Sequence, residues 1–397
     1  MSLFTFRSRI KNRNLLAFLG VGLLYFVSRL WGLTVFPIFT DESIYIHLAE
    51  RVADDPIHLF LFRMEGKQPL FFWLNALTLH VFADPLVAGR MVCVFAGFAS
   101  LTGIYLIGRN FYSVNHGLTA ALIYVFCPYT LFFDRLAVVD SLLCAFGVWM
   151  VYVALCIAHD NEELHQEESC EVSGSSYTRT GFLVLGMLMG LAFFTKATAV
   201  LLMPVPVVVL FIYECHNRKG FWKLLSLSGL TACLMIAPIY LFGKKVGYFE
   251  RTELLQIPNR LALTPAELLA FPWAIWRRNV NIAMDFFATY LTMPVILIIA
   301  LGLGLGLRER KGSVLALWAI IPTVSIIMVA NGFFSRYFMI SVPPLILLAA
   351  VAVMRLAEFL DVKLGEYFHS ELQVRKFVLP AVLLTFILSD SFFLPGS

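Results

Sequence analysis

A small set of acidic, basic and phenolic residues stands out in a sequence that is otherwise strongly apolar. The set comprises Asp41, Glu42, Lys67, Asp140, Lys196, Arg336 and Tyr337. A carboxylate can remove the proton from an attacking hydroxyl group. Lysines and arginines can hold a phosphate group and stabilise the charge that it gains as it leaves. These residue types therefore suit a reaction in which a hydroxyl displaces a phosphate-linked group.

The composition places this chemistry in a membrane. The chain has 397 residues, of which 60% are hydrophobic and 14% are charged, and its mean hydropathy is +0.82. A soluble domain cannot hide so much apolar surface, so lipid must surround it. The net charge is only +4 and the basic residues are scattered, which excludes nucleic acid as a partner. The seven cysteines and eight histidines show no spacing typical of a disulfide framework or a zinc site.

We expect an all-α polytopic fold, because about 20 apolar residues are needed for each crossing. The sequence predicts about eleven spans, near residues 14–36, 86–108, 116–133, 141–158, 180–195, 197–213, 224–242, 285–307, 313–330, 337–355 and 377–394. Residues 1–355 would form one transmembrane module. Residues 356–397 would form an amphipathic segment and the last span.

The loops between the spans define the two sides of the membrane. The stretch from Pro69 to Phe82 is only about 21 Å long as a helix, so we expect it to lie on the membrane within a first outer loop, 37–85. With a cytoplasmic N-terminus, the basic stretches 218–223 and 308–311 then face the cytoplasm, as does an acidic connector at 159–179. The outer loop 243–284 is also basic and fits this orientation less well.

The same count of spans puts every residue of the initial set, together with Asp134 and Arg135, on the extracytoplasmic side. Charges at membrane depth are costly, which favours a function for Lys196 in its apolar hairpin. Taken alone, the Asp41–Glu42 pair also fits a solvated surface, Lys67 a residue that snorkels to the interface, and Arg336–Tyr337 an interfacial anchor. Together, the residues indicate sugar transfer from a polyprenyl-phosphate donor.

Six stretches resemble the bacterial protein-mannosyltransferase-like glycosyltransferases of the GT-C class. This class includes protein O-mannosyltransferases and the lipid A aminoarabinose transferase. The resemblance runs from about residue 29 to 350, and it rests on the order of the motifs RLWGL…FTDESIY, GKQPLFFWLNAL, AGRMVCVFAG…YLIGRNFY, FFDRLAVVDSLL, GLAFFTKATAVLLMP and SRYFMISVPPLILLAA.

The resemblance implies a role for each matching position. Asp41 matches the catalytic aspartate, Glu42 its companion acid, and Asp140 the aspartate of the second loop. Lys67, Lys196, Arg336 and Tyr337 match residues at the donor phosphate, and Arg90 and Arg135 match supporting arginines. Many relatives carry a further C-terminal domain, which this sequence is expected to lack.

Two departures from the family pattern concern the metal. Gln68 replaces a proline, and Gly66 stands where the aminoarabinose branch has a glutamate associated with zinc; Glu65 and His58 lie nearby. We therefore expect no required metal and no other cofactor, while a divalent cation between Asp41, Asp140 and the phosphate stays an alternative.

The sequence thus predicts an inverting glycosyltransferase of the inner or plasma membrane. The donor would be a polyprenyl-phosphate sugar, and the acceptor a hydroxyl on a protein, lipid or glycan at the extracytoplasmic face. One alternative is a flippase or transporter of lipid-linked sugars, which would need polar residues through both leaflets. A second alternative is a catalytically idle subunit.

Overall fold

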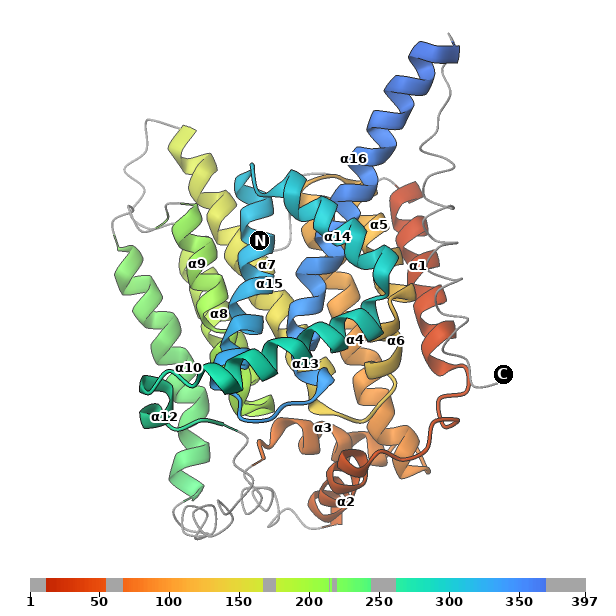
Figure 1. Cartoon of the computed structure of the whole chain (residues 1–397). Coiled ribbons are helices and arrows are strands. Elements are labelled where there is room, and N and C mark those ends of the chain that lie inside the picture. The colour runs from red at the N-terminus through yellow and green to blue at the C-terminus, as the bar shows by residue number, and fades with distance from the viewer. Residues whose placement is uncertain are drawn as a thin grey trace.

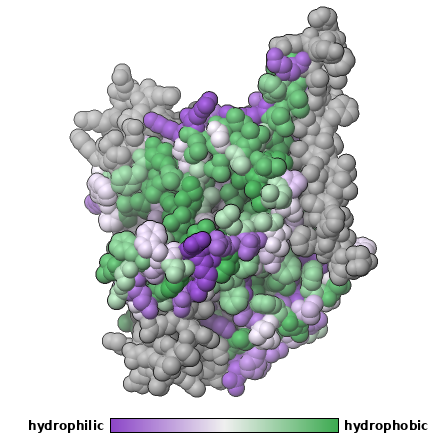
Figure 2. Space-filling model, in the orientation of Figure 1, coloured by the Kyte–Doolittle hydropathy of each residue, from purple (hydrophilic) through white to green (hydrophobic). Residues whose placement is uncertain are grey.

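A computed structural model describes residues 12–54, 67–166, 176–213, 215, 220–243 and 262–368. Within these ranges the chain is helical, and the sole strand-like feature is one antiparallel bridge between Ala262 and Ala330. The helices pack into a bundle whose visible face is largely apolar, with hydrophilic residues towards its ends and where one helix, α13, crosses it (Figures 1 and 2). The predicted all-α membrane fold is confirmed.

Long apolar helices form the body of the bundle. Six helices in the described ranges are long and apolar enough to cross a membrane, or seven if the bent pair α13 and α14 is counted as one span. They are α1 (Asn12–Leu30), α4 (Pro85–Phe111), α7 (Val139–Gln166), α10 (Phe221–Gly243), α15 (Arg310–Val329) and η5 (Ser335–Ser341) with α16 (Val342–Phe368).

Shorter apolar helices complete the bundle. They are α5 (Val114–Phe126), α8 (Ser176–Thr195) and the pair η2 (Ala197–Leu201) and α9 (Pro204–Ile212). The predicted last span, 377–394, lies outside the described residues. The total of eleven spans therefore stays a prediction.

Two predicted spans are each divided between two α-helices, and a proline lies at the start of the second helix in both. The stretch 116–133 is α5 followed by α6 (Pro128–Phe133), which restarts at Pro128. The stretch 285–307 is not one straight helix, because α13 (Trp273–Leu291) and α14 (Met293–Gly306) meet at an angle of 108°. Thr292 between them has a φ of 61°, and a proline near the start of α14 lacks the N–H that a continuous helix needs.

Several predicted loops are more helical than expected. In the first outer loop, the helix expected at Pro69–Phe82 is α3 (Leu70–Leu79), and a further helix, α2 (Thr40–Asp54), lies with it at one end of the bundle (Figure 1). The acidic connector is shorter than 159–179, since α7 continues to Gln166 and α8 begins at Ser176. The outer loop 243–284 contains α12 (Pro265–Leu269) and most of α13, and α16 continues beyond the predicted boundary at residue 355.

Glycines allow close approach where helices turn back at the opposite end of the bundle. A Cβ atom on Gly108 of α4 would lie 2.7 Å from the Cα atom of Gly117 on α5. This distance is too short for two real carbon atoms, so alanine at either position would push α4 and α5 apart. The tight contact holds the C-terminal end of α4 against α5; the opposite end of α4 carries Arg90.

Candidate active site

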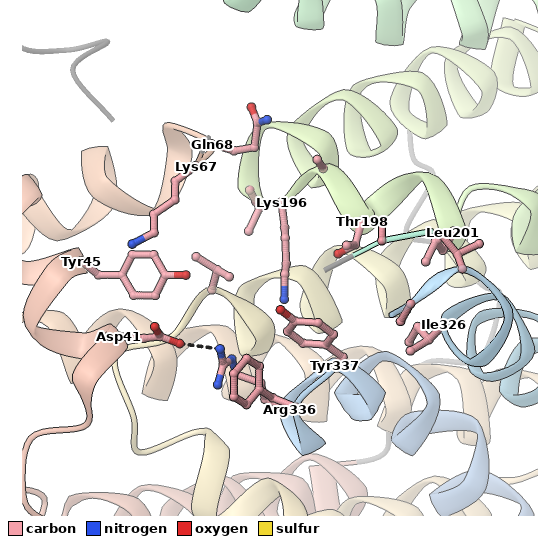
Figure 3. A pocket seen from close by; sticks show the side chains of 17 residues that line it. Asp41, Tyr45, Lys67, Gln68, Lys196, Thr198, Leu201, Ile326, Arg336 and Tyr337 are labelled. Atoms are coloured by element: carbon pink, nitrogen blue, oxygen red, sulfur yellow. Dashed lines mark hydrogen bonds and ion pairs between the residues drawn. The ribbon is translucent and has the colours of Figure 1, made fainter. Parts of the chain in front are cut away.

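Five of the predicted site residues meet in a pocket of about 400 Å³ at the end of the bundle where α2 and α3 lie. Its charged and phenolic lining consists of Asp41, Tyr45, Lys67, Lys196, Arg336 and Tyr337. The remaining lining is mainly apolar and includes Leu201, Ile326 and Val329 (Figure 3). Residues almost 300 positions apart in sequence thus surround one cavity that has a charged wall and an apolar wall.

Each charged residue sits at a helix end or at a break between helices. Asp41 lies in the first turn of α2, where the helix dipole stabilises a carboxylate. Lys196 has extended backbone angles between α8 and η2, and Lys67 precedes α3. Arg336 lies in η5, between α15 and α16. At such positions a side chain can point into the pocket while the adjoining helices stay in the apolar bundle.

Ion pairs connect both aspartates to the cations. The Arg336 guanidinium pairs with the Asp41 carboxylate, and its Nε atom lies 3.5 Å from Oδ2 of Asp140. The other oxygen of Asp140 accepts a hydrogen bond from Lys196 Nζ at 2.6 Å. Asp140 does not line the pocket and its side chain is only 3% exposed, whereas that of Asp41 is 27% exposed. Asp41 is therefore the carboxylate that a substrate can reach.

Aromatic rings hold the cations from their other sides. Lys196 Nζ lies 3.8 Å from the centre of the Tyr337 ring, and Lys67 Nζ lies 4.8 Å from that of Tyr45. The Arg336 guanidinium lies 4.3 Å from the centre of the Phe334 ring. Such cation–π contacts stabilise positive charge where water is scarce. They leave the charges able to receive an anion.

Burial changes the pKa values of Tyr45 and Lys196, two residues of the pocket. Burial raises the pKa of the Tyr45 hydroxyl well above its usual value, and the nearby carboxylates of Asp140 and Asp41 raise it further. This phenol therefore stays protonated and can donate a hydrogen bond. Burial also lowers the pKa of Lys196, while the paired carboxylate of Asp140 opposes this shift. Asp140 thus favours the charged form of Lys196.

Glu42, which was predicted to act beside Asp41, lies outside the pocket and is fully buried. Its carboxylate accepts hydrogen bonds from Nε and Nη2 of Arg90 at 2.9 and 2.8 Å and from the backbone N–H groups of Phe39 and Ala137 at 2.9 and 2.6 Å. Arg90 donates its other N–H groups to three carbonyls of the preceding linker, those of Leu33, Phe36 and Pro37.

The four bonds to Glu42 leave its carboxylate no lone pair for a substrate. The predicted catalytic role of Glu42 is therefore not supported by its geometry. Instead, Glu42 with its partner Arg90 joins the start of α2, next to Asp41, to the loop before α7 through the N–H group of Ala137. This loop leads to Asp140. Arg90 supports the site through Glu42, in agreement with its predicted position near the site.

Replacing Glu42 by glutamine is expected to destabilise the protein by about 3–5 kcal/mol, because the Arg90 charge would stay buried without a partner. The measurement is the thermal unfolding midpoint in detergent, with Glu50→Gln on the same helix as the control, since Glu50 is 43% exposed. The double variant Glu42→Leu, Arg90→Leu should lose less stability than either single leucine variant. Normal stability of Glu42→Gln together with lost turnover would instead show a chemical role for Glu42.

The second supporting arginine has a similar structural role. Arg135 donates hydrogen bonds to the carbonyls of Trp31 and Gly32, at 2.8 and 2.6 Å, and it does not line the pocket. Next to it in sequence, the buried Asp134 carboxylate lies 3.8 Å from Arg29 of α1. These contacts fasten the end of α1 to the loop before α7.

Sequence reasoning missed some residues of the pocket. Tyr45 lies one helical turn after Asp41 on α2, so the i, i+4 spacing was an available signal. Gln68 and Thr198 also line the pocket, next to the predicted Lys67 and close to Lys196. Their sequence neighbours were the only indication of their place.

A metal site would need several histidine, cysteine or acidic side chains close together within the described ranges. No group of three or more histidine, cysteine or acidic side chains in those ranges could hold a metal ion. The oxygens of Asp41 and Asp140 are paired with Arg336 and Lys196, so they do not point together at one position that a cation could occupy. His58 and Glu65, the nearest alternative ligands suggested by the sequence, lie outside the described residues.

The arrangement of helices is that of the GT-C membrane glycosyltransferases, and the predicted resemblance is confirmed at this level. A family model described as dolichyl-phosphate-mannose-protein mannosyltransferase matches residues 66–166. By sequence, no curated protein matches the chain. The protein is accordingly a multi-pass membrane protein with the GT-C fold.

Solved structures of two proteins are similar to this chain. ArnT from Cupriavidus metallidurans in the apo state has a TM-score of 0.61 and 16% identity, over 87% of this chain and 60% of that chain. The same enzyme bound to undecaprenyl phosphate has a TM-score of 0.59. The oligosaccharyltransferase AglB from Archaeoglobus fulgidus, in complex with an inhibitory peptide and a dolichol-phosphate, has a TM-score of 0.64 and 12% identity, over 96% of this chain and 55% of that chain. The chain thus spans somewhat more than half the length of these proteins.

Proposed function

We propose that the protein transfers a sugar from a polyprenyl-phosphate donor to a hydroxyl acceptor, with inversion at the anomeric carbon. The observation that carries this proposal is the Arg336 guanidinium, which pairs with Asp41 in the pocket and with the enclosed Asp140 beside it, where Lys67 and Lys196 also line the pocket. Structures with this fold have been determined with undecaprenyl phosphate and with a dolichol-phosphate, which supports a donor of this class.

The charges of the site suit a single phosphodiester. Three cations (Lys67, Lys196 and Arg336) and two carboxylates (Asp41 and Asp140) leave one net positive charge. A sugar linked to a lipid through one phosphate carries one negative charge, so the two charges cancel. The apolar wall formed by Leu201, Ile326 and Val329 can receive the first units of the prenyl chain.

The proposed reaction is one displacement. The acceptor oxygen attacks the anomeric carbon while the bond from that carbon to the phosphate oxygen breaks, and the electron pair of this bond stays on the phosphate. Asp41, the exposed carboxylate, accepts the proton of the acceptor hydroxyl. Arg336 and Lys196 stabilise the leaving phosphate, and Asp140 holds both cations in place.

In the proposed reaction, Arg336 has two successive partners, Asp41 and the donor phosphate. Before the donor binds, the guanidinium neutralises Asp41. A bound phosphate would take over part of that contact, and the Asp41 carboxylate would then be available to the acceptor. Arg336 would stay attached through Asp140, which is too enclosed to meet the acceptor.

The purified protein, incubated with a polyprenyl-phosphate sugar and a hydroxyl acceptor, is expected to release free polyprenyl phosphate and to form the glycosylated acceptor. We expect this turnover to persist in EDTA, because Arg336 and Lys196 already supply the positive charge that a divalent cation would bring. Mass spectrometry of both products is the measurement. A protein that only moves the donor across a bilayer would release no polyprenyl phosphate, and loss of turnover in EDTA that zinc alone restores would contradict the metal-free reaction.

We further propose that the pocket opens at the extracytoplasmic face of the inner or plasma membrane. The turn between α14 and α15 carries Arg308, and the first two residues of α15 are Arg310 and Lys311. This turn lies at the opposite end of the bundle from α2 and α3 (Figure 1), and basic residues favour the cytoplasmic side. Single cysteines placed at Ser43 and at Ser313 are expected to react with an impermeant reagent from opposite sides. Labelling of both from one side would contradict this orientation. The natural acceptor can be identified by comparing envelope glycans and glycolipids with and without the protein.

A further inference from the structure

The C-terminal end of α15 is held by hydrogen bonds from a segment that lies outside it. Five successive backbone carbonyls, from Ile327 to Asn331, accept hydrogen bonds from residues 262–279. The Asn279 side-chain amide donates to Ile327 and Ala330 at 2.9 and 2.7 Å, Trp276 Nε1 to Met328 at 3.0 Å, the Leu263 backbone N–H to Val329 at 2.8 Å, and Arg278 to Asn331.

The carbonyls of Ile327, Met328 and Val329 lie in the last turn of α15, where carbonyls have no partner within the helix, and those of Ala330 and Asn331 follow directly after it. The C-terminus of a helix also carries a partial negative charge, which favours the nearby guanidinium of Arg278. The contacts therefore give residues 327–331 one defined position against α13. This matters because Ile326, Val329 and Ala330 line the pocket.

Aromatic side chains of α13 also contact the chain near Arg336. Phe286 and Phe287 of α13 pack edge-on and tilted against Phe333 and Phe338, at centroid distances of 6.2 and 5.2 Å. Further along α13, Tyr290 packs against Tyr129, whose hydroxyl donates a hydrogen bond to the carbonyl of Ser335. Contacts from α13 thus reach the chain on both sides of Arg336.

The segment between α15 and η5 depends on such contacts. Residues 331–334 belong to no helix, so little in their own backbone fixes where the next residues lie. The two ion pairs of Arg336 require its guanidinium to reach Asp41 and Asp140 together. The position of the helix that precedes this segment consequently decides how well the guanidinium is placed.

Asn279 is the one polar residue in the described part of α13 that is completely buried. The opposite face of the helix is open, with Trp273 71% and Met284 65% exposed. A buried amide on such a helix is costly unless both of its N–H groups are bonded, and here both reach the end of α15.

We infer that α13 holds the Arg336–Tyr337 segment in position and that Asn279 is the positioning residue through which α13 acts. This inference rests on the proposed function, in which Arg336 holds the donor phosphate. Asn279 touches no substrate. It places Arg336 by fixing the end of α15, and α13 owes its position across the bundle to the bend at Thr292 (Figure 1).

Asn279→Ala is expected to raise the Kd for undecaprenyl phosphate and the KM for the donor by about tenfold, since two hydrogen bonds are lost. The KM for the acceptor and kcat should change by no more than about twofold to threefold. Amide exchange in a peptide covering residues 330–338 should become faster. Asn281→Ala is the matched control, because Asn281 lies on the exposed face of the same helix and should change none of these values.

A milder variant keeps the inference testable if Asn279→Ala does not fold. Trp276→Phe keeps an aromatic side chain and removes the N–H group that bonds to Met328, so a rise of about threefold in the Kd is expected. Lower thermal stability with an unchanged Kd would show a purely structural role and would overturn the inference. If the wild-type protein binds no undecaprenyl phosphate, the proposed function is wrong. If the wild-type protein binds it and only Arg336 variants weaken binding, the proposed function stands and the positioning role of α13 and Asn279 is wrong.

Discussion

Replacing Asp41 by asparagine is expected to lower kcat by about 10²–10⁴-fold, the usual effect of losing a well-placed general base. Asparagine keeps the size of the side chain and can still contact the neighbouring groups, but it cannot take the proton of the acceptor hydroxyl. The carboxylate of Asp41 in the wild-type protein is more exposed than that of Asp140 and can therefore be reached by an acceptor. The measurement is the rate of a single turnover with donor and acceptor both saturating.

The same variant should bind the donor at least as tightly as the wild type. Asp41 is an ion-pair partner of Arg336, so its neutralisation leaves the guanidinium more available to a phosphate. Asp140→Asn is the informative contrast, because Asp140 holds both Arg336 and Lys196 and its loss should raise the donor KM. Full activity of a folded Asp41→Asn protein would show that another group is the base.

Replacing Arg336 by glutamine is expected to weaken donor binding by about 10–100-fold, because a hydrogen bond to a charged group contributes about 1.5–3 kcal/mol. The change also leaves Oδ2 of the buried Asp140 without its cationic neighbour. Lysine at this position should restore only part of the affinity, since a single ammonium group cannot match the planar fork that reaches both carboxylates. Binding of undecaprenyl phosphate to purified protein is the direct measurement.

A matched control for Arg336 lies on α13. Arg277 is exposed and outside the pocket, so Arg277→Gln removes one positive charge without touching the site. If both variants weaken binding equally, the effect is one of general charge at the membrane surface. If neither does so, Arg336 does not hold the phosphate.

The hydropathy pattern of the chain was sufficient to predict its class and to place five of the pocket residues at the same end of the bundle. Each apolar segment that crosses the membrane reverses the direction of the chain, so counting such segments places Asp41, Lys196 and Arg336 at one end. This inference needs only local sequence. It failed where a local signal was overruled, as at Thr292, where the chain turns by 108° inside a stretch that is apolar enough to continue.

Only the tertiary structure separated Asp41 from Glu42. The two acids are adjacent in sequence and alike in chemistry, but neighbouring residues on a helix point about 100° apart. One carboxylate therefore faces the pocket and the other faces the core. What each then does depends on its partners, Arg336 for Asp41 and Arg90 for Glu42, which lie far along the chain. The packing of distant helices brings these partners into contact, and no local pattern specifies that packing.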